Sequence, residues 1–298
     1  MRKVLILTVG SREVAFGHLT RCLSLYQAFI AKGVKAELII CGDDAVSDLL
    51  SDEDYEMYDW LGGGEQLWEK VCGSDIIILD SYTAEKSLYE KISHISGGKL
   101  VAIDDYNRLK YPKGVVINPS ICGDEVGYEM REGVSYLTGH EYIVLREEFW
   151  DVPEKEIKYE VKDILVTSGG VMHPDFMHNI INPLKNKNNF NFHIIDTGVN
   201  RLSAKEMLHL MLKSDICISG GGQTINELAR VGTPTIGICF YENQRLNIEA
   251  WGNEGFIDYK GWYNDDGLLK KLEESVEGLL PYRERIKRSK IGRDKVDG

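Results

Sequence analysis

The feature that most constrains this chain of 298 residues is a repeated alternation of short apolar runs with amphipathic helical segments. Residues 4–9 form the first apolar run, and residues 17–31 follow with their apolar side chains along one helical face. Later runs, such as residues 76–79 and 100–103, are almost wholly apolar, as in strands covered on both faces. Repeated strand–helix units of this kind predict parallel sheets with right-handed crossovers, and so an α/β fold.

The alternation falls into two series. The first series predicts strands at residues 4–9, 34–41, 76–79, 100–103, 115–118 and 142–145, and helices at 17–31 and 85–95. The second predicts strands at residues 163–167, 190–196, 215–219 and 234–240, and helices at 174–184, 204–213 and 224–231.

A charged segment at residues 150–162 separates the two series and is predicted to be an interdomain linker. We therefore expect an N-terminal Rossmann-like domain over residues 1–152, a second Rossmann-like domain over 160–275, and a helical tail over 276–298. Two such domains are expected to place a cleft between the carboxyl ends of their sheets.

Charge and cysteine usage narrow the function. The formal net charge of −12 argues against general nucleic-acid binding, and the locally basic segment 283–295 is predicted to be a solvated terminal helix. The six cysteines include no C-x-x-C pair, which fits a reducing cytoplasm better than a zinc site or a disulfide framework. No stretch approaches the ~20 apolar residues that span a membrane. We expect a cytoplasmic monomer with a small-molecule substrate, no cofactor, no nucleic-acid partner and no membrane insertion.

Three consecutive glycines at positions 220–222 join a predicted strand to a predicted helix. Glycines let backbone N–H groups approach a phosphate, and a helix N-terminus adds partial positive charge. The segment is neither a P-loop nor a G-x-G-x-x-G dinucleotide fingerprint. A tight turn with Thr224 near the helix cap is the alternative interpretation. Glu227, one turn into the helix, either reaches a ribose diol or complements the helix dipole.

A histidine, His18, opens the helix that follows the first predicted strand, in the segment F-G-H-L-T-R. Its side chain can accept a proton near neutral pH, which suits the activation of a water molecule. The alternative is that His18 caps or packs against its own helix. Arg12 and Arg21 can counter a diphosphate, although a solvated helix face explains Arg21 equally well.

Aspartates follow two of the predicted strands, in D-S-Y at residues 80–82 and D-D-Y at residues 104–106. Paired aspartates suit acid–base chemistry or a metal, but turn and cap chemistry is the commoner explanation at strand ends. No set of His, Asp and Glu with ligand spacing surrounds them, so no metal site is expected.

Taken together, these motifs resemble one family. The segments G-F-G-H-L-T-R-C, L-D-S-Y, A-I-D-D-Y, I-N-P-S, Y-L-T-G-H-E-Y-I-V-L-R-E-E-F, S-D-I-C-I-S-G-G-G-Q-T-I-N-E-L and G-T-P-T-I-G-I-C-F-Y-E-N-Q occur in that family's order. The family is the UDP-2,4-diacetamido-2,4,6-trideoxy-β-L-altropyranose hydrolases of pseudaminic acid biosynthesis, with relatives described as spore-coat polysaccharide proteins. The resemblance covers nearly the whole chain.

The resemblance implies a GT-B fold, with UDP held mainly by the second domain, and inverting, metal-independent hydrolysis at the anomeric carbon. It implies that His18 is the general base that activates water. The residues expected to bind the substrate, including the two arginines above, are Arg12, Gly17, Arg21, Asp105, Arg146, Asn243 and Gln244. At the nucleotide it implies Gly169, Gly170, Gly221, Gly222, Gln223, Thr224 and Glu227.

Two features depart from the family. The turn after the first strand of the second domain reads S-G-G-V-M-H-P at residues 168–174, without the acid that the family usually has there. Only one strand–helix step separates Asn186 from Ser214, where one more unit is expected. Both departures fall in the nucleotide half.

Two other functions stay open. A GT-B glycosyltransferase using a UDP-amino sugar, resembling the enzyme that completes the peptidoglycan lipid intermediate, needs an acceptor and often a membrane-facing patch. The sequence has no convincing patch of that kind, which favours water as the acceptor. A non-catalytic sugar-nucleotide binder is the third possibility, and fold alone cannot distinguish the three.

Overall fold

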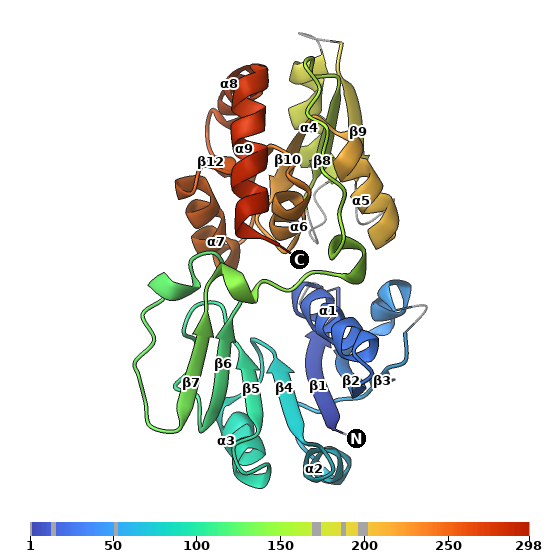
Figure 1. The fold of residues 1–298 in the computed structure, drawn as a ribbon, viewed down its shortest axis with the longest axis vertical. Coiled ribbons are helices and arrows are strands. Elements are labelled where there is room, and N and C mark those ends of the chain that lie inside the picture. The colour runs from blue at the N-terminus through green and yellow to red at the C-terminus, as the bar shows by residue number, and fades with distance from the viewer. Residues whose placement is uncertain are drawn as a thin grey trace. The chain divides into compact units, whose positions relative to one another are not determined.

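The computed structural model describes residues 2–12, 16–50, 53–168, 174–185, 189–195 and 202–297, and within these all side chains but those of residues 48, 49 and 174–179. The chain divides into two compact units, Met1–Glu147 and Glu148–Gly298 (Figure 1). Each unit is an α/β structure built on one parallel sheet.

The first unit contains a sheet of seven strands in the order β3-β2-β1-β4-β5-β6-β7, and all neighbouring pairs are parallel. The strands are β1 (Lys3–Gly10), β2 (Lys35–Gly42), β3 (Glu56–Met57), β4 (Ile76–Asp80), β5 (Leu100–Ile103), β6 (Gly114–Asn118) and β7 (Val134–Thr138). The helices are α1 (Gly17–Ala31), α2 (Glu65–Cys72) and α3 (Lys86–Ile95). The 3-10 turns are η1 (Asp44–Leu49), η2 (Gly123–Glu125), η3 (His140–Tyr142) and η4 (Glu147–Phe149), and η4 crosses the boundary between the two units.

Strand β1 is apolar on both faces because a core lies on each side of it. One core contains Val4 and Ile6 of β1 with Leu19 of α1. The opposite core contains Leu5 and Leu7 with side chains of α2 and α3. Each fully buried side chain of this size contributes roughly 1.5–3 kcal/mol of transfer free energy, so the two cores hold the carboxyl end of β1 firmly in place.

The last strand of this sheet differs from the prediction. The strand predicted at residues 142–145 is wrong, because β7 occupies Val134–Thr138 and Tyr142 ends the turn η3. Gly139, with a φ of 103°, breaks the strand before the apolar residues that suggested it. As an edge strand, β7 pairs only with β6, and most of its residues are partly exposed, so its apolar pattern is weak.

The second unit contains a parallel sheet of five strands in the order β12-β11-β10-β8-β9. The strands are β8 (Asp163–Thr167), β9 (Asn191–Ile195), β10 (Ile216–Gly220), β11 (Thr235–Cys239) and β12 (Ile257–Trp262). The helices are α4 (Pro174–Lys185), α5 (Ala204–Lys213), α6 (Thr224–Val231), α7 (Glu242–Asn253), α8 (Leu268–Gly278) and α9 (Tyr282–Lys295).

Helix α6, which follows the glycines, ends at a well-defined position. Gly232 ends it in the left-handed conformation, with φ of 80°. A Cβ at Gly232 would lie 2.5 Å from Oγ of Ser289 in α9, so close packing of the two helices also requires glycine. The terminal helix is therefore packed rather than simply solvated, which corrects the prediction for residues 283–295.

Two buried cations hold the edges of the second unit together. Arg285 of α9 is fully buried and donates to the carbonyls of Lys158 and Tyr159. Lys155 donates from Nζ to the carbonyl oxygens of Met211, Leu212 and Ser214, at 2.8, 2.7 and 2.7 Å. The charged segment 150–162 is thus packed into this unit by hydrogen bonds to backbone carbonyls.

Candidate functional site

The carboxyl edge of the first sheet brings together residues that are distant in sequence. Strand β1 pairs with β4 so that Thr8 lies opposite Asp80, and β4 pairs with β5 so that Asp80 lies opposite Ile103. Because parallel strands end at the same edge of a sheet, helix α1, Asp80 and the loop after β5 meet there. His18, the second residue of α1, is 6% exposed at this edge.

His18 forms a buried pair with Asp80. Its Nδ1 lies 2.7 Å from Oδ1 of Asp80, a side chain with no exposed surface. Helix α1 has no side-chain cap bond, so the alternative in which His18 caps its own helix is wrong. Sequence reasoning identified His18, but for Asp80 it left acid–base chemistry, a metal and turn chemistry open. The signal was the segment L-D-S-Y, which by itself also fits ordinary turn chemistry.

Arg21, one turn after His18, joins the two carboxylates. Its guanidinium donates to Asp80 from Nε and a terminal nitrogen, at 2.8 and 2.9 Å. It donates to Asp105 from both terminal nitrogens, at 2.6 and 3.1 Å. Arg21 is 8% exposed, so the solvated-face interpretation is wrong. Because four of its hydrogen bonds go to these carboxylates, we assign it a positioning role rather than a diphosphate contact.

Tyr82 was missed by sequence reasoning as a site residue, although it stands in the same L-D-S-Y segment. Its hydroxyl donates a very short hydrogen bond to Oδ2 of Asp105. Its ring meets the ring of His18 edge-on, with 4.2 Å between centroids and 87° between planes. The edge of Tyr82 thus limits the orientations open to the imidazole.

The two adjacent aspartates after β5 differ in function. Asp104 accepts hydrogen bonds from the backbone N–H groups of Asn107 and Arg108 and from the hydroxyls of Tyr111 and Tyr128. Turn chemistry therefore explains Asp104, whereas Asp105 faces Arg21 and Tyr82.

The electrostatics fix the charge of each partner of His18. Burial alone raises the pKa of Asp80, but the Arg21 guanidinium and then His18 outweigh it and hold that pKa well below its usual range. Likewise, Arg21 outweighs burial and lowers the pKa of Asp105. Burial, and then Asp105, raise the pKa of Tyr82 far above its usual value, so its hydroxyl stays protonated. Both carboxylates are therefore ionised at neutral pH.

An ionised Asp80 only accepts hydrogen bonds, so a neutral His18 carries its proton on Nδ1 and its lone pair on Nε2. Across the residues that the structure describes, Nε2 of His18 makes no hydrogen bond. The arrangement can accept a proton at Nε2 while the Asp80 carboxylate stabilises the resulting imidazolium. That is the arrangement a general base requires.

In the second unit, strand β10 leads through two glycines to helix α6. A Cβ at Gly221 would lie 2.9 Å from Cβ of Gln244, so packing alone requires glycine there. A Cβ at Gly222 would have only Nε2 of Gln244 within 4.0 Å among the described residues. Packing among the described residues does not explain Gly222, and a backbone without a Cβ is open to close approach by another group.

Around these glycines the amide side chains are ordered by contacts within the unit. Oε1 of Gln244 accepts from the backbone N–H of Phe240 at 3.2 Å, and Oε1 of Gln223 accepts from the Asn226 amide at 3.3 Å. Thr224 begins α6 and is half-buried, and Glu227 is 2% exposed. Gln223 and Gln244, with Gly221 and Gly222, therefore form a polar cluster at the start of α6.

The other residues implied by the resemblance lie as follows. Arg12 is exposed, and its backbone N–H donates to Asp43 at 3.1 Å. Gly17 begins α1 with open space where a Cβ would be. Arg146 is half-buried after η3, and Asn243 is exposed in the first turn of α7. Gly169 and Gly170 lie outside the described residues.

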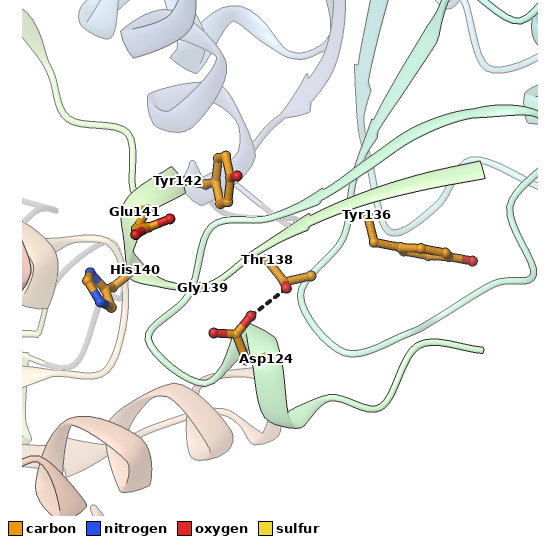
Figure 2. Close-up of a pocket in the computed structure, with 7 residues that line it drawn as sticks. All are labelled: Asp124, Tyr136, Thr138, Gly139, His140, Glu141 and Tyr142. Atoms are coloured by element: carbon orange, nitrogen blue, oxygen red, sulfur yellow. Dashed lines mark hydrogen bonds between the residues drawn. The ribbon is translucent and has the colours of Figure 1, made fainter. Parts of the chain in front are cut away.

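A cavity of about 330 Å³ opens elsewhere in the first unit, at the end of β7. Figure 2 shows its lining, with Thr138 bonded to Asp124 at 2.5 Å and the ring of Tyr136 directed away from His140. None of the site residues implied by the resemblance lines it, although all of its lining residues except Asp124 stand in the motif Y-L-T-G-H-E-Y-I-V-L-R-E-E-F. We place the candidate site at His18, because a buried carboxylate, that of Asp80, lies 2.7 Å from this imidazole and orients it.

Two searches over the described ranges bear on the class of protein. No group of three or more His, Cys, Asp or Glu side chains in those ranges is placed to hold a metal ion. No helix in them combines the length and the apolar character that crossing a membrane needs.

Comparison with known proteins gives two curated relatives and many solved structures. No protein-family model matches the chain. The chain is 24% identical over 297 residues to a Helicobacter pylori protein named pseudaminic acid cytidylyltransferase and UDP-2,4-diacetamido-2,4,6-trideoxy-beta-L-altropyranose hydrolase, covering 95% of this chain and 52% of that protein. It is 22% identical over 274 residues to the uncharacterized protein MJ1062 of Methanocaldococcus jannaschii, covering 81% and 56%. The chain thus spans about half the length of the curated relatives it matches.

Among solved structures, MurG of Acinetobacter baumannii superposes with a TM-score of 0.65 at 11% identity, over 99% of this chain and 96% of that one. The spinosyn rhamnosyltransferase SpnG, complexed with thymidine diphosphate, gives 0.61 at 12%, over 99% and 96%. These likenesses show the fold, and the predicted GT-B class is confirmed. Along almost its whole length, the chain resembles the UDP-diacetamido-altropyranose hydrolase named in the Helicobacter pylori protein, as its sequence motifs predict.

Proposed function

We propose that the chain is a sugar-nucleotide-processing enzyme that hydrolyses a UDP-linked diacetamido-trideoxy sugar, releasing UDP and the free sugar. The observation that carries this proposal is the buried pair of His18 and Asp80 at 2.7 Å, which leaves Nε2 of His18 as a proton acceptor. Support for the substrate class comes from the relative named as a hydrolase of such a sugar and from the GT-B fold.

In the proposed reaction, Nε2 of His18 takes a proton from a water molecule. The water oxygen forms a bond to the anomeric carbon while the bond from that carbon to the β-phosphate oxygen breaks. UDP leaves with the electron pair, and the sugar inverts because one displacement occurs. Asp80 stabilises the imidazolium, which later returns its proton to solvent.

The nucleotide is assigned to the start of α6 in the second unit. The first N–H groups of a helix lack partners within the helix, and they stabilise negative charge that develops on the departing diphosphate. Gly222 allows a phosphate to approach this backbone closely, since a Cβ there would meet only Gln244, at 4.0 Å. In this proposal Gln223, Gln244, Asn243 and Glu227 contact the nucleotide or sugar.

A glycosyltransferase is the second candidate, and the likeness to MurG favours it. The same base would then remove a proton from an acceptor hydroxyl instead of water. The two functions differ in one requirement: a transferase releases UDP only when an acceptor is present.

The test incubates the purified chain with the UDP-diacetamido-trideoxy-altrose sugar and follows UDP by phosphorus NMR, without acceptor and with EDTA. We expect release by the wild type, unchanged by EDTA, with one anomer of the free sugar appearing first. His18→Ala should lose at least about 10²-fold in rate, the lower range for a general base. His94→Ala, an exposed histidine of α3, is the matched control and should keep wild-type activity.

Two outcomes would contradict the proposal. If UDP binds but is not released without an acceptor, hydrolysis of this sugar is ruled out and a transferase or a binder remains. If UDP release proceeds equally in wild type and His18→Ala, hydrolysis stands but His18 is not the base.

A further inference from the structure

We infer that Asp80 and Arg21 are positioning residues that hold His18 in the Nδ1-protonated tautomer, so that its lone pair lies on Nε2. This inference rests on the proposed function for its kinetic consequences, but the tautomer itself can be measured without any substrate. It concerns Asp80, for which the sequence left several roles open, and Arg21, which the resemblance placed on the substrate side.

In its contacts with His18 and Arg21, the carboxylate of Asp80 acts only as a hydrogen-bond acceptor. Oδ1 accepts from Nδ1 of His18 at 2.7 Å and from a terminal nitrogen of Arg21 at 2.9 Å. Oδ2 accepts from Nε of Arg21 at 2.8 Å. A guanidinium only donates, so both oxygens of Asp80 must remain acceptors. The proton between Asp80 and His18 must then come from the imidazole.

Arg21 in turn is fixed by Asp105. The second carboxylate receives two hydrogen bonds from the guanidinium, and Tyr82 donates a third to it. Two carboxylates share one guanidinium, so this buried cluster retains one negative charge. A proton that arrives on His18 during the reaction would balance this charge.

Among the residues that the structure describes, the charged and titratable side chains that contact His18 or Asp80 are those of this cluster and Cys22, whose Sγ lies 3.9 Å from Oδ2 of Asp80. Asp80 faces it from the end of β4, Arg21 lies one turn along α1, and Tyr82 meets it from the loop after β4. Asp105 acts at one remove, through Arg21 and Tyr82. The state of His18 is therefore set by a few groups, each of which can be changed singly.

Replacing Asp80 by asparagine should shift His18 away from the Nδ1-protonated tautomer while keeping the shape of the side chain at position 80. The amide has one acceptor and one donor end, whereas Arg21 presents donors to both positions. In one orientation the NH2 group faces Nδ1 of His18, and the imidazole proton must then move to Nε2. In a Ser–His–Asp triad the corresponding change lowers kcat by about 10⁴-fold through the wrong tautomer.

The experiment measures the tautomer by long-range proton–nitrogen NMR on the full chain labelled with ¹⁵N-histidine. His18 is assigned from the signal that disappears in His18→Asn. We expect the neutral wild-type ring to carry its proton on Nδ1, and Asp80→Asn to move a major fraction of it to Nε2. His193 of the second unit, which pairs with Asp163 through Nε2 at 2.8 Å, should not change and serves as the control in the same spectrum.

The kinetic arm uses the rate of UDP release. Asp80→Asn should lower kcat about 10²- to 10⁴-fold, the range a general base contributes, with KM changed less than about threefold. Arg21→Lys keeps the charge but not the two-pronged geometry, and should give a smaller loss of kcat.

A wild-type His18 with its neutral proton on Nε2 would overturn the inference, and this result does not depend on the stability of any variant. An Asp80→Asn protein that keeps the Nδ1 proton and the wild-type kcat would overturn it as well. A chain that shows the expected tautomers yet releases no UDP would leave the inference standing and contradict the proposed function alone.

Discussion

The two glycines before α6 allow packing to be separated from ligand binding. Gly221→Ala places a Cβ 2.9 Å from Cβ of Gln244 and 3.3 Å from Cδ1 of Ile248. Overpacking of this kind costs about 1–3 kcal/mol. Gly222→Ala places a Cβ no nearer than 4.0 Å to Gln244, so the free energy of unfolding should change by less than about 0.5 kcal/mol.

Nucleotide affinity should show a different pattern. A methyl group at position 222 occupies the space through which a phosphate would approach the backbone. Loss of one hydrogen bond to a charged group costs about 1.5–3 kcal/mol, and 1.4 kcal/mol is about tenfold in affinity. Gly222→Ala should therefore weaken UDP binding roughly 10- to 100-fold while leaving the fold intact.

Urea unfolding and isothermal titration with UDP measure the two quantities on the same preparations. We expect Gly221→Ala to lose stability and Gly222→Ala to lose affinity. If Gly222→Ala binds UDP with the wild-type dissociation constant, the reasoning that places a phosphate beside this glycine is refuted. If Gly222→Ala is instead the less stable variant, the packing argument fails.

Two further predictions concern stability. Lys155→Met should lower the free energy of unfolding by about 3 kcal/mol, because the carbonyls of Leu212 and Ser214 lose a charged donor, and each loss costs about 1–3 kcal/mol. Urea unfolding measures this cost, and the control Lys158→Met, at an exposed lysine, should cost under about 0.5 kcal/mol. Equal costs for the two variants would contradict the role of Lys155. Burial raises the pKa of Asp105, but Arg21 outweighs burial and lowers that pKa in the folded chain. The stability that this pair contributes should therefore be complete above about pH 4 and fall as the pH drops through the pKa of Asp105 in the folded chain. Hydrogen exchange of β4 and β5 should show this acid sensitivity, and Asp105→Asn should reduce it; an unchanged acid response would show that the pair adds no stability.

The sequence predicts well those elements whose ends carry local signals. Helix α5 has the bounds predicted for it, because Ser203 and Glu206 form a capping box at its start. Helix α6 also has its predicted bounds, since Gly232 ends it in a left-handed conformation. Strands β4 and β8, buried by neighbours on both sides, lie within one residue of the prediction. Local signals of this kind do not depend on the order of strands in the sheet.

Other features were missed because their signal is not local. A terminal helix was predicted over residues 283–295 but its packing was not, because Arg285 is buried and donates to carbonyls of residues more than a hundred positions away. In edge strand β7 only Val134 is buried, so the apolar pattern of the strand is weak. In both cases tertiary contacts, rather than periodicity, determine the structure.

The candidate site was predicted in part. His18 and Asp105 were singled out, but the distinction between Asp104 and Asp105 depends on side-chain direction after β5, which the sequence does not specify. Asp80 lies 62 residues from His18, and only the adjacency of β1 and β4 brings them together. A strand-end aspartate is usually a turn residue, so its pairing with a histidine becomes visible only once the strand order is known.

The central claim is that water attacks the anomeric carbon of a UDP-sugar, and turnover in water enriched in oxygen-18 tests it most directly. The products are separated as they form and analysed by mass spectrometry. The control is UDP incubated in the same water without the UDP-sugar. The account predicts that oxygen-18 enters the free sugar and that the released UDP carries none, in the absence of any acceptor. Oxygen-18 in the phosphate of UDP, or no turnover until an acceptor is supplied, would contradict it.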